Sequence, residues 1–373
     1  MPNFLVVSAR AIYTEYADAC SFEFEDAIID SLQADLLELS NIPSVKTQTT
    51  GENRDKYNKE YDIVFLVANN FRKLAKMYAL LEKYKIPAKK TYAYVFGAYI
   101  HELKYLTLPG ARHFIPRYRR ICQIDHIFVP FKENQPVLAN LFDLPFHYSP
   151  MAVDVLKVAG DHPSRFISVN GFGRQEPMLN DLLAATFNKP GSPYIYQHTN
   201  AIISPGMKNW QQYRELFWHS LRNSQLSLTF DSLYHNPNGR SQHSFVGPRW
   251  YESLAAGAVV VGQSPKTEEA LALLDWRDAT IDLPDDPERA LKKIMELLDS
   301  PDDLRQIGNR NTQQMFLKHD WRYRIEKMLI ETGFPRVQSL DRQIQELKER
   351  SKNIAQSDVR ILKTKLSHSA SNL

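Results

Sequence analysis

The sequence predicts an α/β protein of two domains, each built around a parallel β-sheet. Short apolar runs alternate with stretches of helical periodicity along most of the chain, which is the pattern of consecutive βαβ units. At 373 residues the chain is too long for one ordinary hydrophobic core and suits two α/β domains and a tail. A hydrophobic fraction of 43% and a charged fraction of 24% are ordinary for a globular protein, so disorder is not its dominant state.

The first domain is predicted over residues 1–155. Four short apolar runs are expected as its buried strands: residues 4–7, 62–67, 91–96 and 126–130. Apolar residues at helical spacing predict helices over 26–39 and 71–84. Together these elements predict a Rossmann-like domain.

A second domain of the same kind is predicted over residues 165–332, after a linker at 156–164. Five apolar runs are expected as its strands: residues 165–169, 194–196, 226–230, 258–261 and 279–283. Ligands of parallel sheets bind at the carboxyl ends of the strands, so the functional residues are expected in a cleft there.

The remaining residues, 336–373, form a charged tail for which helix and disorder are both open. Val337, Leu340, Ile344 and Leu347 recur at helical spacing and would form one narrow apolar stripe. The stripe fits either a solvated terminal helix or a coiled-coil contact that makes a homodimer.

Charge and cysteine content narrow the class of protein. The net charge of +3 is close to neutral for this length, so no overall field favours nucleic acid as a partner. Cys20 and Cys122 are too few for a disulfide framework, which favours a reducing compartment. The first residues lack the pattern of a signal peptide, and no apolar stretch reaches ~18 residues. A cytoplasmic protein is therefore expected, with peripheral attachment to the inner face of the membrane left open.

Residues 247–261, GPRWYESLAAGAVVV, point most directly to a ligand. Pro248 suits the first position of a helix, and Gly257 suits the residue just past its end. The first turn of such a helix stabilises a diphosphate, and Arg249 can add a bidentate contact. Glu252, one turn later on the same face, can accept hydrogen bonds from both hydroxyls of a ribose. A purely structural Arg249–Glu252 pair fits the same spacing.

This segment resembles the R-x-x-E-x-x-A-x-G-x-x-x-V segment of group 1 glycosyltransferases, and in particular of their spore-protein (CgeB-like) branch. The similarity continues through residues 285–287 and 297–305 and ends in the HDWRYR run at 319–324. It covers residues 165–332. The first half is similar only in SPMAVD, at 149–154, which resembles the hinge entry of these enzymes.

The resemblance implies a GT-B fold, in which two Rossmann-like domains face each other across a cleft. It implies that the second domain binds a nucleotide-diphosphate sugar and that the first binds a glycan, lipid-linked or protein acceptor, with no cofactor and no obligatory metal. Matched by position, Glu252 corresponds to the glutamate on the donor ribose and Arg249 to a diphosphate contact. Many members carry another glutamate eight positions earlier, where this chain has Ser244, so the stereochemical course is left open.

A second candidate for donor binding is the NGFGR run directly after the predicted strand 165–169: Asn170, Gly171, Gly173 and Arg174. Glycines at a strand end let the backbone approach a phosphate, and Arg174 can neutralise it, although a simple turn has the same composition. In the polar loop 235–244, Arg240 can reach the donor or stay solvated. The two histidines of that loop lack flanking carboxylates, so no metal site is predicted.

The first domain offers two candidates for the base that takes a proton from the acceptor. His101 follows an apolar run near the end of a strand, and a histidine titrates near neutral pH. Asp18 lies in the loop after the first strand, which faces the cleft in such folds. A structural role fits either residue.

Four arginines lie among aromatic residues in the same domain: Arg112, Arg117, Arg119 and Arg120. Such a patch can hold an anionic lipid-linked acceptor or a membrane surface, and it can also grip single-stranded nucleic acid. Because the donor pattern points to sugar transfer, the first reading is preferred to nucleic acid. A solvated face is the simplest alternative.

Two alternatives to a transferase stay open. A nucleotide-sugar epimerase or a phosphorylase would use the same architecture, although no convincing lysine motif for a phosphorylase is present. A catalytically silent nucleotide- or glycan-binding protein is left open by Ser244.

Overall fold

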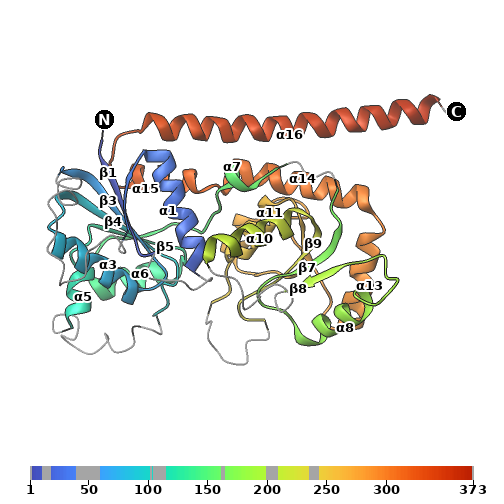
Figure 1. Cartoon of the computed structure of the whole chain (residues 1–373), viewed down its shortest axis with the longest axis horizontal. Helices are drawn as coiled ribbons and strands as arrows, with labels where there is room; N and C mark the ends of the chain where they lie inside the picture. The colour runs from blue at the N-terminus through green and yellow to red at the C-terminus, as the bar shows by residue number, and fades with distance from the viewer. Residues whose placement is uncertain are drawn as a thin grey trace. The chain divides into compact units, whose positions relative to one another are not determined.

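A computed structural model describes residues 2–10, 18–38, 59–100, 103, 115–160, 164–198, 209–234 and 243–371, with side chains described up to residue 355. The chain divides into two compact units (Figure 1). Residues 1–151 and 321–344 make the first unit, and residues 152–320 and 345–373 make the second. Each unit contains one parallel sheet with helices, so the predicted fold class is confirmed.

The first unit holds a six-stranded sheet in the order β2-β1-β3-β4-β5-β6, with every pair parallel. Its strands are β1 Phe4–Ser8, β2 Asp35–Glu38, β3 Tyr61–Ala68, β4 Ala88–Val95, β5 His126–Val129 and β6 Phe146–Tyr148. Its helices are α1 Ala19–Leu32, α3 Phe71–Tyr84, α5 Pro116–Ile121, α6 Asn134–Phe142 and α15 Trp321–Glu331. From β1 the chain steps outward to β2 and from β3 it steps the other way to β4. Right-handed crossovers therefore place α1 and α3 on opposite faces.

One predicted helix of this unit is wrong. The helix expected over 26–39 begins earlier, at Ala19, and ends at Leu32, because Gln33 adopts a left-handed conformation with φ 55°. Leu36 and Leu37 belong to β2, where they pair with Val6 and Val7 of β1, and Leu39 lies outside the described residues. Their spacing continued the helical period by coincidence, and sheet pairing decided their conformation.

The second unit holds a five-stranded parallel sheet in the order β11-β10-β9-β7-β8. Its strands are β7 Ile167–Gly171, β8 Tyr196–His198, β9 Ser224–Phe230, β10 Val259–Gln263 and β11 Ile281–Asp282. Its helices are α7 Val155–Val158, α8 Pro177–Phe187, α10 Trp210–Arg222, α11 Pro248–Ala255, α12 Glu268–Leu273, α13 Pro287–Leu298 and α14 Pro301–Lys318. The core on the α8 and α13 face includes Val169, Leu226, Val261 and Ile294.

The direction of the crossovers in the second unit decides which helices are neighbours. The chain moves one way from β7 to β8, and the other way from β8 to β9 and from β9 to β10. Right-handed crossovers therefore put α10 and α11 together on the face opposite α8. Figure 1 shows α10 and α11 next to each other beside the strands.

The boundary between the units differs from the predicted one at residue 332. Trp321, at the start of α15, stacks on Phe24 with ring centroids 4.1 Å apart. Arg324 donates from Nε to the Pro150 carbonyl oxygen at 3.0 Å. Burial of these side chains assigns α15 to the first unit, although it directly follows the second unit in sequence.

The tail is a helix, α16 Gln338–Ser371. Its apolar stripe, Val337, Leu340, Ile344 and Leu347, is buried within the chain itself. The start of the helix is also tied to α1, since Ser339 donates from Oγ to the Ser31 carbonyl oxygen at 2.7 Å. These four side chains are therefore already packed inside the chain, and a homodimer contact through the tail stays a prediction.

None of the helices in the described ranges is long and apolar enough to span a bilayer.

Candidate functional site

Helix α11 begins as the sequence predicts. Pro248 occupies its first turn, and Gly247 is the N-cap, with no side chain bonded to the cap. At the other end Gly257 adopts φ +72°, a conformation that glycine accepts at little cost. In the first turn of α11 Pro248 has no N–H and the Trp250 N–H donates to the Gly247 carbonyl oxygen at 3.1 Å, so an anion at the helix start would meet the N–H of Arg249.

The Glu252 carboxylate lies in the middle of α11 and is almost fully buried, with 4% of the residue exposed. Arg214 of α10 donates from Nη2 to Glu252 Oε1 at 2.6 Å. Arg214 is itself buried, and its guanidinium lies 4.4 Å from the ring centroid of Phe217. Glu252 is thus held by a charged partner from the neighbouring helix.

Sequence reasoning missed Arg214, although a signal was present. Arg214, Phe217, Trp218 and Leu221 are spaced as one face of a helix and all are buried. A charged residue on such a face needs a partner of opposite charge. Only the tertiary structure identifies that partner as Glu252.

The guanidinium of Arg249 has a distant carboxylate and an aromatic ring as neighbours, but one of its nitrogens has no hydrogen-bond partner among the described residues. Its Nε lies 3.7 Å from Glu252 Oε2, and its guanidinium lies 4.4 Å from the Phe217 ring centroid. Its Nη1 is buried and has no hydrogen-bond partner among the described residues. Two arginines therefore surround one carboxylate, which leaves one positive charge and a buried donor for an anion.

The first two residues of the NGFGR run, Asn170 and Gly171, are held by contacts within the second unit. Asn170 is fully buried, accepts from the Phe172 N–H at 3.1 Å and donates to Ser224 Oγ at 3.2 Å. A Cβ added to Gly171 would lie 2.5 Å from Tyr196 Oη. The local turn and packing account for both residues, and their contact with a phosphate stays a prediction.

Gly173, by contrast, lies beside the arginine of the site. It adopts φ +90°, and a Cβ there would lie 3.6 Å from Arg249 Nη2. The structure therefore brings Gly173, in the loop after β7, next to Arg249, in the first turn of α11. A phosphate bound to Arg249 would meet the backbone at Gly173 without a side chain in the way.

Arg174 and Ser244 both contact the residue that follows β9. Arg174 donates from Nη1 to the Asp231 carbonyl oxygen at 2.8 Å in an exposed position. Ser244 donates from Oγ to Asp231 Oδ2 at 2.7 Å. The serine at the position of the family's second glutamate therefore holds a carboxylate in place.

Of the two candidates for the catalytic base, the structure describes Asp18 but not His101. His101 lies outside the described residues, as do Arg240 and Arg112. Asp18 is buried, with its Oδ2 2.6 Å from Lys73 Nζ and its Oδ1 accepting from Asn69 Nδ2. Both carboxylate oxygens of Asp18 are engaged, so neither is open to an acceptor hydroxyl in this structure.

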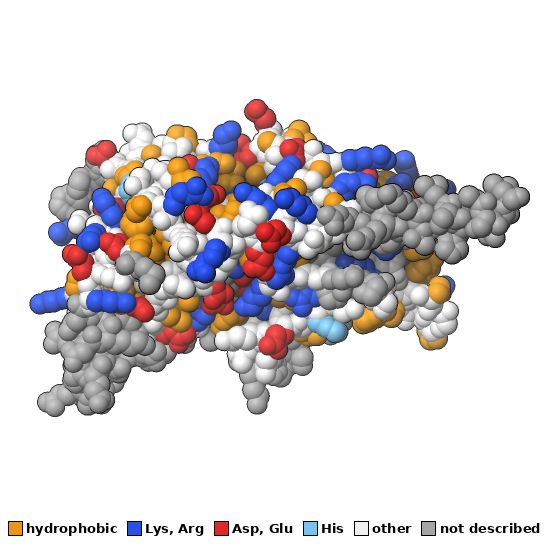
Figure 2. All heavy atoms as spheres, turned by 90° about the horizontal axis from the view of Figure 1, so that it is seen from above, with side chains coloured by type: hydrophobic (Ala, Val, Ile, Leu, Met, Phe, Trp, Pro, Cys, Tyr) orange, Lys and Arg blue, Asp and Glu red, His pale blue; other side chains and the backbone are white. Residues whose placement is uncertain are grey.

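The structure describes Arg117, Arg119 and Arg120 of the predicted basic patch, whose contact with an anionic acceptor or a membrane stays a prediction. Arg120 forms an exposed ion pair with Glu82 at 2.8 Å, and Tyr118 is buried with 1% exposed. An aromatic side chain in the core cannot contact a membrane. On the face shown in Figure 2, Lys and Arg side chains are interspersed with Asp and Glu.

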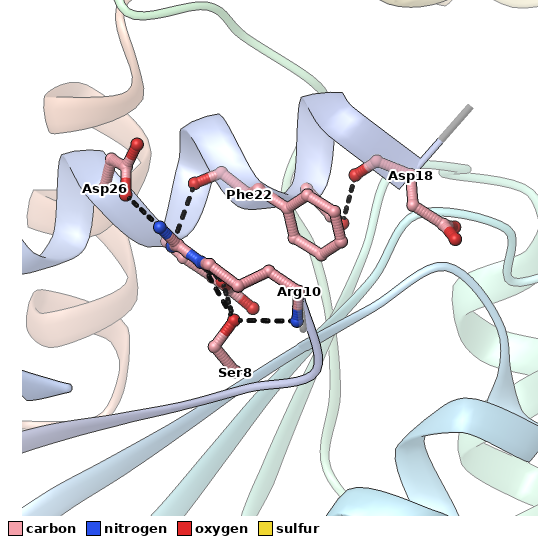
Figure 3. A network of polar contacts seen from close by, with 7 residues as sticks. Ser8, Arg10, Asp18, Phe22 and Asp26 are labelled. Carbon is pink, nitrogen blue, oxygen red and sulfur yellow. Dashed lines mark hydrogen bonds and ion pairs between the residues drawn. The ribbon is translucent and has the colours of Figure 1, made fainter. Parts of the chain in front are cut away.

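A buried polar network in the first unit was not predicted from the sequence (Figure 3). Ser8, at the end of β1, and Arg10 both donate to Glu25 Oε2, the arginine from Nη2 at 2.8 Å. Arg10 also donates from Nη1 to Asp26 Oδ1 at 2.8 Å. Burial raises the pKa of Glu25 to about 7, against the opposing effect of Arg10. The network ties the residues after β1 to α1.

Within the described ranges, no group of three or more His, Cys, Asp or Glu side chains is arranged to hold a metal ion.

Comparison with known proteins finds a family match for the segment that contains these residues. Residues 174–330 match the family described as "Glycosyl transferase-like". The matched range includes Arg214, Arg249 and Glu252 and most of the second unit. No curated protein matches the chain.

Solved structures match the chain at low identity and low TM-score. The chain is 13% identical to TarM, over 83% of this chain and 57% of that chain, with a TM-score of 0.42. It is 10% identical to UGT89C1 from Arabidopsis thaliana complexed with UDP-L-rhamnose, over 88% of this chain and 98% of that chain, with a TM-score of 0.39. The chain thus spans little more than half the length of TarM.

Proposed function

We propose that the protein is a GT-B glycosyltransferase of the CgeB-like branch. It transfers a sugar from a nucleoside-diphosphate donor to a glycan, lipid-linked or protein acceptor, without an obligatory metal. The observation that supports this most is the buried, unpartnered Nη1 of Arg249 beside the uncapped start of α11. Both lie in the segment that is glycosyl transferase-like.

In the proposed reaction, the bond between the sugar's anomeric carbon and the diphosphate oxygen breaks, and the acceptor oxygen bonds to that carbon. The electron pair of the broken bond leaves with the diphosphate. The guanidinium and the backbone N–H of Arg249 stabilise this charge, which grows in the transition state. Glu252 Oε2 accepts from the donor ribose, and His101 is proposed to take the acceptor's proton.

The donor site is tested by calorimetry with a panel of nucleoside diphosphates. Arg249→Ala should weaken binding at least tenfold, because it removes the only surplus cation among the described groups around Glu252. Glu252→Ala should weaken nucleoside diphosphates more than inorganic pyrophosphate, which has no ribose. Arg277→Ala is the matched control, since the Arg277 side chain is 85% exposed in the same unit. Equal binding by the wild type and both site variants would refute the donor site.

Activity is tested by hydrolysis and transfer from UDP- and GDP-sugars, with and without EDTA. Turnover that depends completely on a divalent ion would contradict the metal-independent mechanism. Donor turnover with no acceptor and no sugar release would instead indicate an epimerase.

Ser244 favours one second candidate, a catalytically silent nucleotide- or glycan-binding protein. Its hydroxyl is bonded to Asp231 where many group 1 enzymes carry a glutamate. Tight binding of a nucleoside diphosphate without turnover of any donor would support this candidate.

A further inference from the structure

The Arg214–Glu252 ion pair lies beside the cation that we assign to the donor, so the three charges cannot act independently. Glu252 has two arginines within reach, Arg214 at 2.6 Å and Arg249 at 3.7 Å. The shorter contact is a charge-assisted hydrogen bond, whereas the longer one exceeds hydrogen-bond distance. Glu252 Oε1 is therefore bonded to Arg214, and Oε2 lies beside Arg249 without a hydrogen bond to it.

Aromatic packing fixes this choice. The Arg214 guanidinium lies 4.4 Å from the ring centroid of Phe217 and 5.0 Å from that of Trp218. Arg249 also lies 4.4 Å from the Phe217 centroid. A planar guanidinium stacks on a ring and still donates in its own plane, which an ammonium group cannot reproduce. Phe217 thus holds both arginines near Glu252, and Trp218 adds a contact to Arg214.

Loss of Arg214 would change the partner of Glu252. A buried carboxylate without a counter-charge is strongly disfavoured, and among the described residues Arg249 is the other cation paired with Glu252. Glu252 would then pair with Arg249 and remove the positive charge that an anionic ligand needs.

We propose that Arg214 is a positioning residue that occupies the Glu252 carboxylate and so keeps the Arg249 guanidinium available to the phosphate groups of a ligand. This inference rests on the proposed donor site. Arg214 itself need not touch the ligand. It acts through the charge and orientation of Glu252.

The test uses the full chain and inorganic pyrophosphate as the probe, with affinity measured by calorimetry. Arg214→Met should weaken pyrophosphate binding at least tenfold, because Glu252 neutralises Arg249. Adding Glu252→Gln to that variant should restore affinity to within about threefold of the wild type, since neither competing charge remains. A purely structural role of Arg214 would not give this recovery, because the second substitution removes a further buried contact.

Glu252→Gln alone gives a second test, which does not require the Arg214→Met variant to fold. It should bind pyrophosphate as tightly as the wild type or more tightly, since no carboxylate competes for Arg249. A tenfold loss in this variant would overturn the inference. So would unchanged binding by Arg214→Met, or a loss that Glu252→Gln does not restore.

The two proposals fail in different ways. If the wild type binds neither pyrophosphate nor any nucleoside diphosphate, both the donor site and the role of Arg214 are refuted. If the wild type binds and Arg249→Ala does not, but Arg214→Met binds normally, only the role of Arg214 falls.

Discussion

Trp321 stacks on Phe24 with the ring centroids 4.1 Å apart and the planes 25° from parallel. Trp321 also meets Tyr94 and Phe96 edge-on, each at 5.7 Å between centroids. These four rings join α15 to α1 and β4 although nearly the whole chain separates Trp321 from Phe24. The integrity of the first unit therefore depends on residues that follow the second unit in sequence.

Trp321→Ala should destabilise the first unit by about 3–5 kcal/mol, because a large buried aromatic side chain is replaced by a cavity. The measurement is urea-induced unfolding followed by circular dichroism. Ile330→Ala is the matched control in the same helix, since Ile330 is 62% exposed. That substitution should change the unfolding free energy by less than about 0.5 kcal/mol. Equal stability of the two variants would contradict the packing role of Trp321.

Gly171→Ala should lower the melting temperature, because its Cβ would lie 2.5 Å from Tyr196 Oη. The cost should be smaller when Tyr196→Phe is already present, since the nearest atom is then gone while ring carbons at 3.1 Å remain. A double-mutant cycle in thermal unfolding measures this coupling. If Gly171→Ala instead weakens pyrophosphate binding at an unchanged melting temperature, the glycine serves the ligand.

Glu25→Gln should change how stability depends on pH. Burial raises the pKa of Glu25 to about 7 from a usual value of 4.5, so the folded state binds a proton more tightly than the unfolded state. Its contribution is therefore fully present below pH 4.5 and is lost as the pH rises through about 7.

The amide of Glu25→Gln does not titrate, so the stability of the variant relative to the wild type should rise across that window. At about 1.4 kcal/mol per pKa unit, the rise should be of order 3 kcal/mol. Unfolding free energies of both proteins at pH 4.5 and pH 7.5 measure it. A difference that stays constant with pH would contradict the shift.

His126 and His147 should titrate below 6.5. The Nδ1 of His126 lies 3.1 Å from the Nε2 of His147, and burial lowers the pKa of both side chains. His147 also lowers the pKa of His126 by charge repulsion, while Asp125 raises it and Lys90 lowers it. Glu331 raises the pKa of His147 and Lys327 lowers it.

The neutral forms are favoured in the folded state, so the stability from this pair is present above pH 6.5 and is lost as the pH falls below it. Imidazole titration followed by NMR measures the two values directly. His147→Asn should raise the pKa of His126 only part of the way, because burial is the larger cause. A His126 value that does not move would mean that the two rings are not coupled.

Local features of the molecule were predictable because they depend on neighbouring residues. Most strands were recognised from short apolar runs, and the limits of α11 followed from Pro248 and Gly257, whose backbone preferences act at one position. The proposed anion site at that helix start was likewise inferred from local sequence features. The prediction failed at Leu36, where a continued helical spacing was overruled by pairing with Val6.

What the sequence by itself determined, then, is the alternation of strands and helices and the placement of Arg249 and Glu252 one turn apart. Only the tertiary structure decided that Glu252 pairs with Arg214, that Arg249 keeps a buried donor without a partner, and that Trp321 belongs to the first unit. The physical reason is that buried charges and aromatic rings are stabilised by whichever side chain the fold brings within a few ångströms. Right-handed crossovers brought α10 beside α11, and sequence spacing carries no record of that contact.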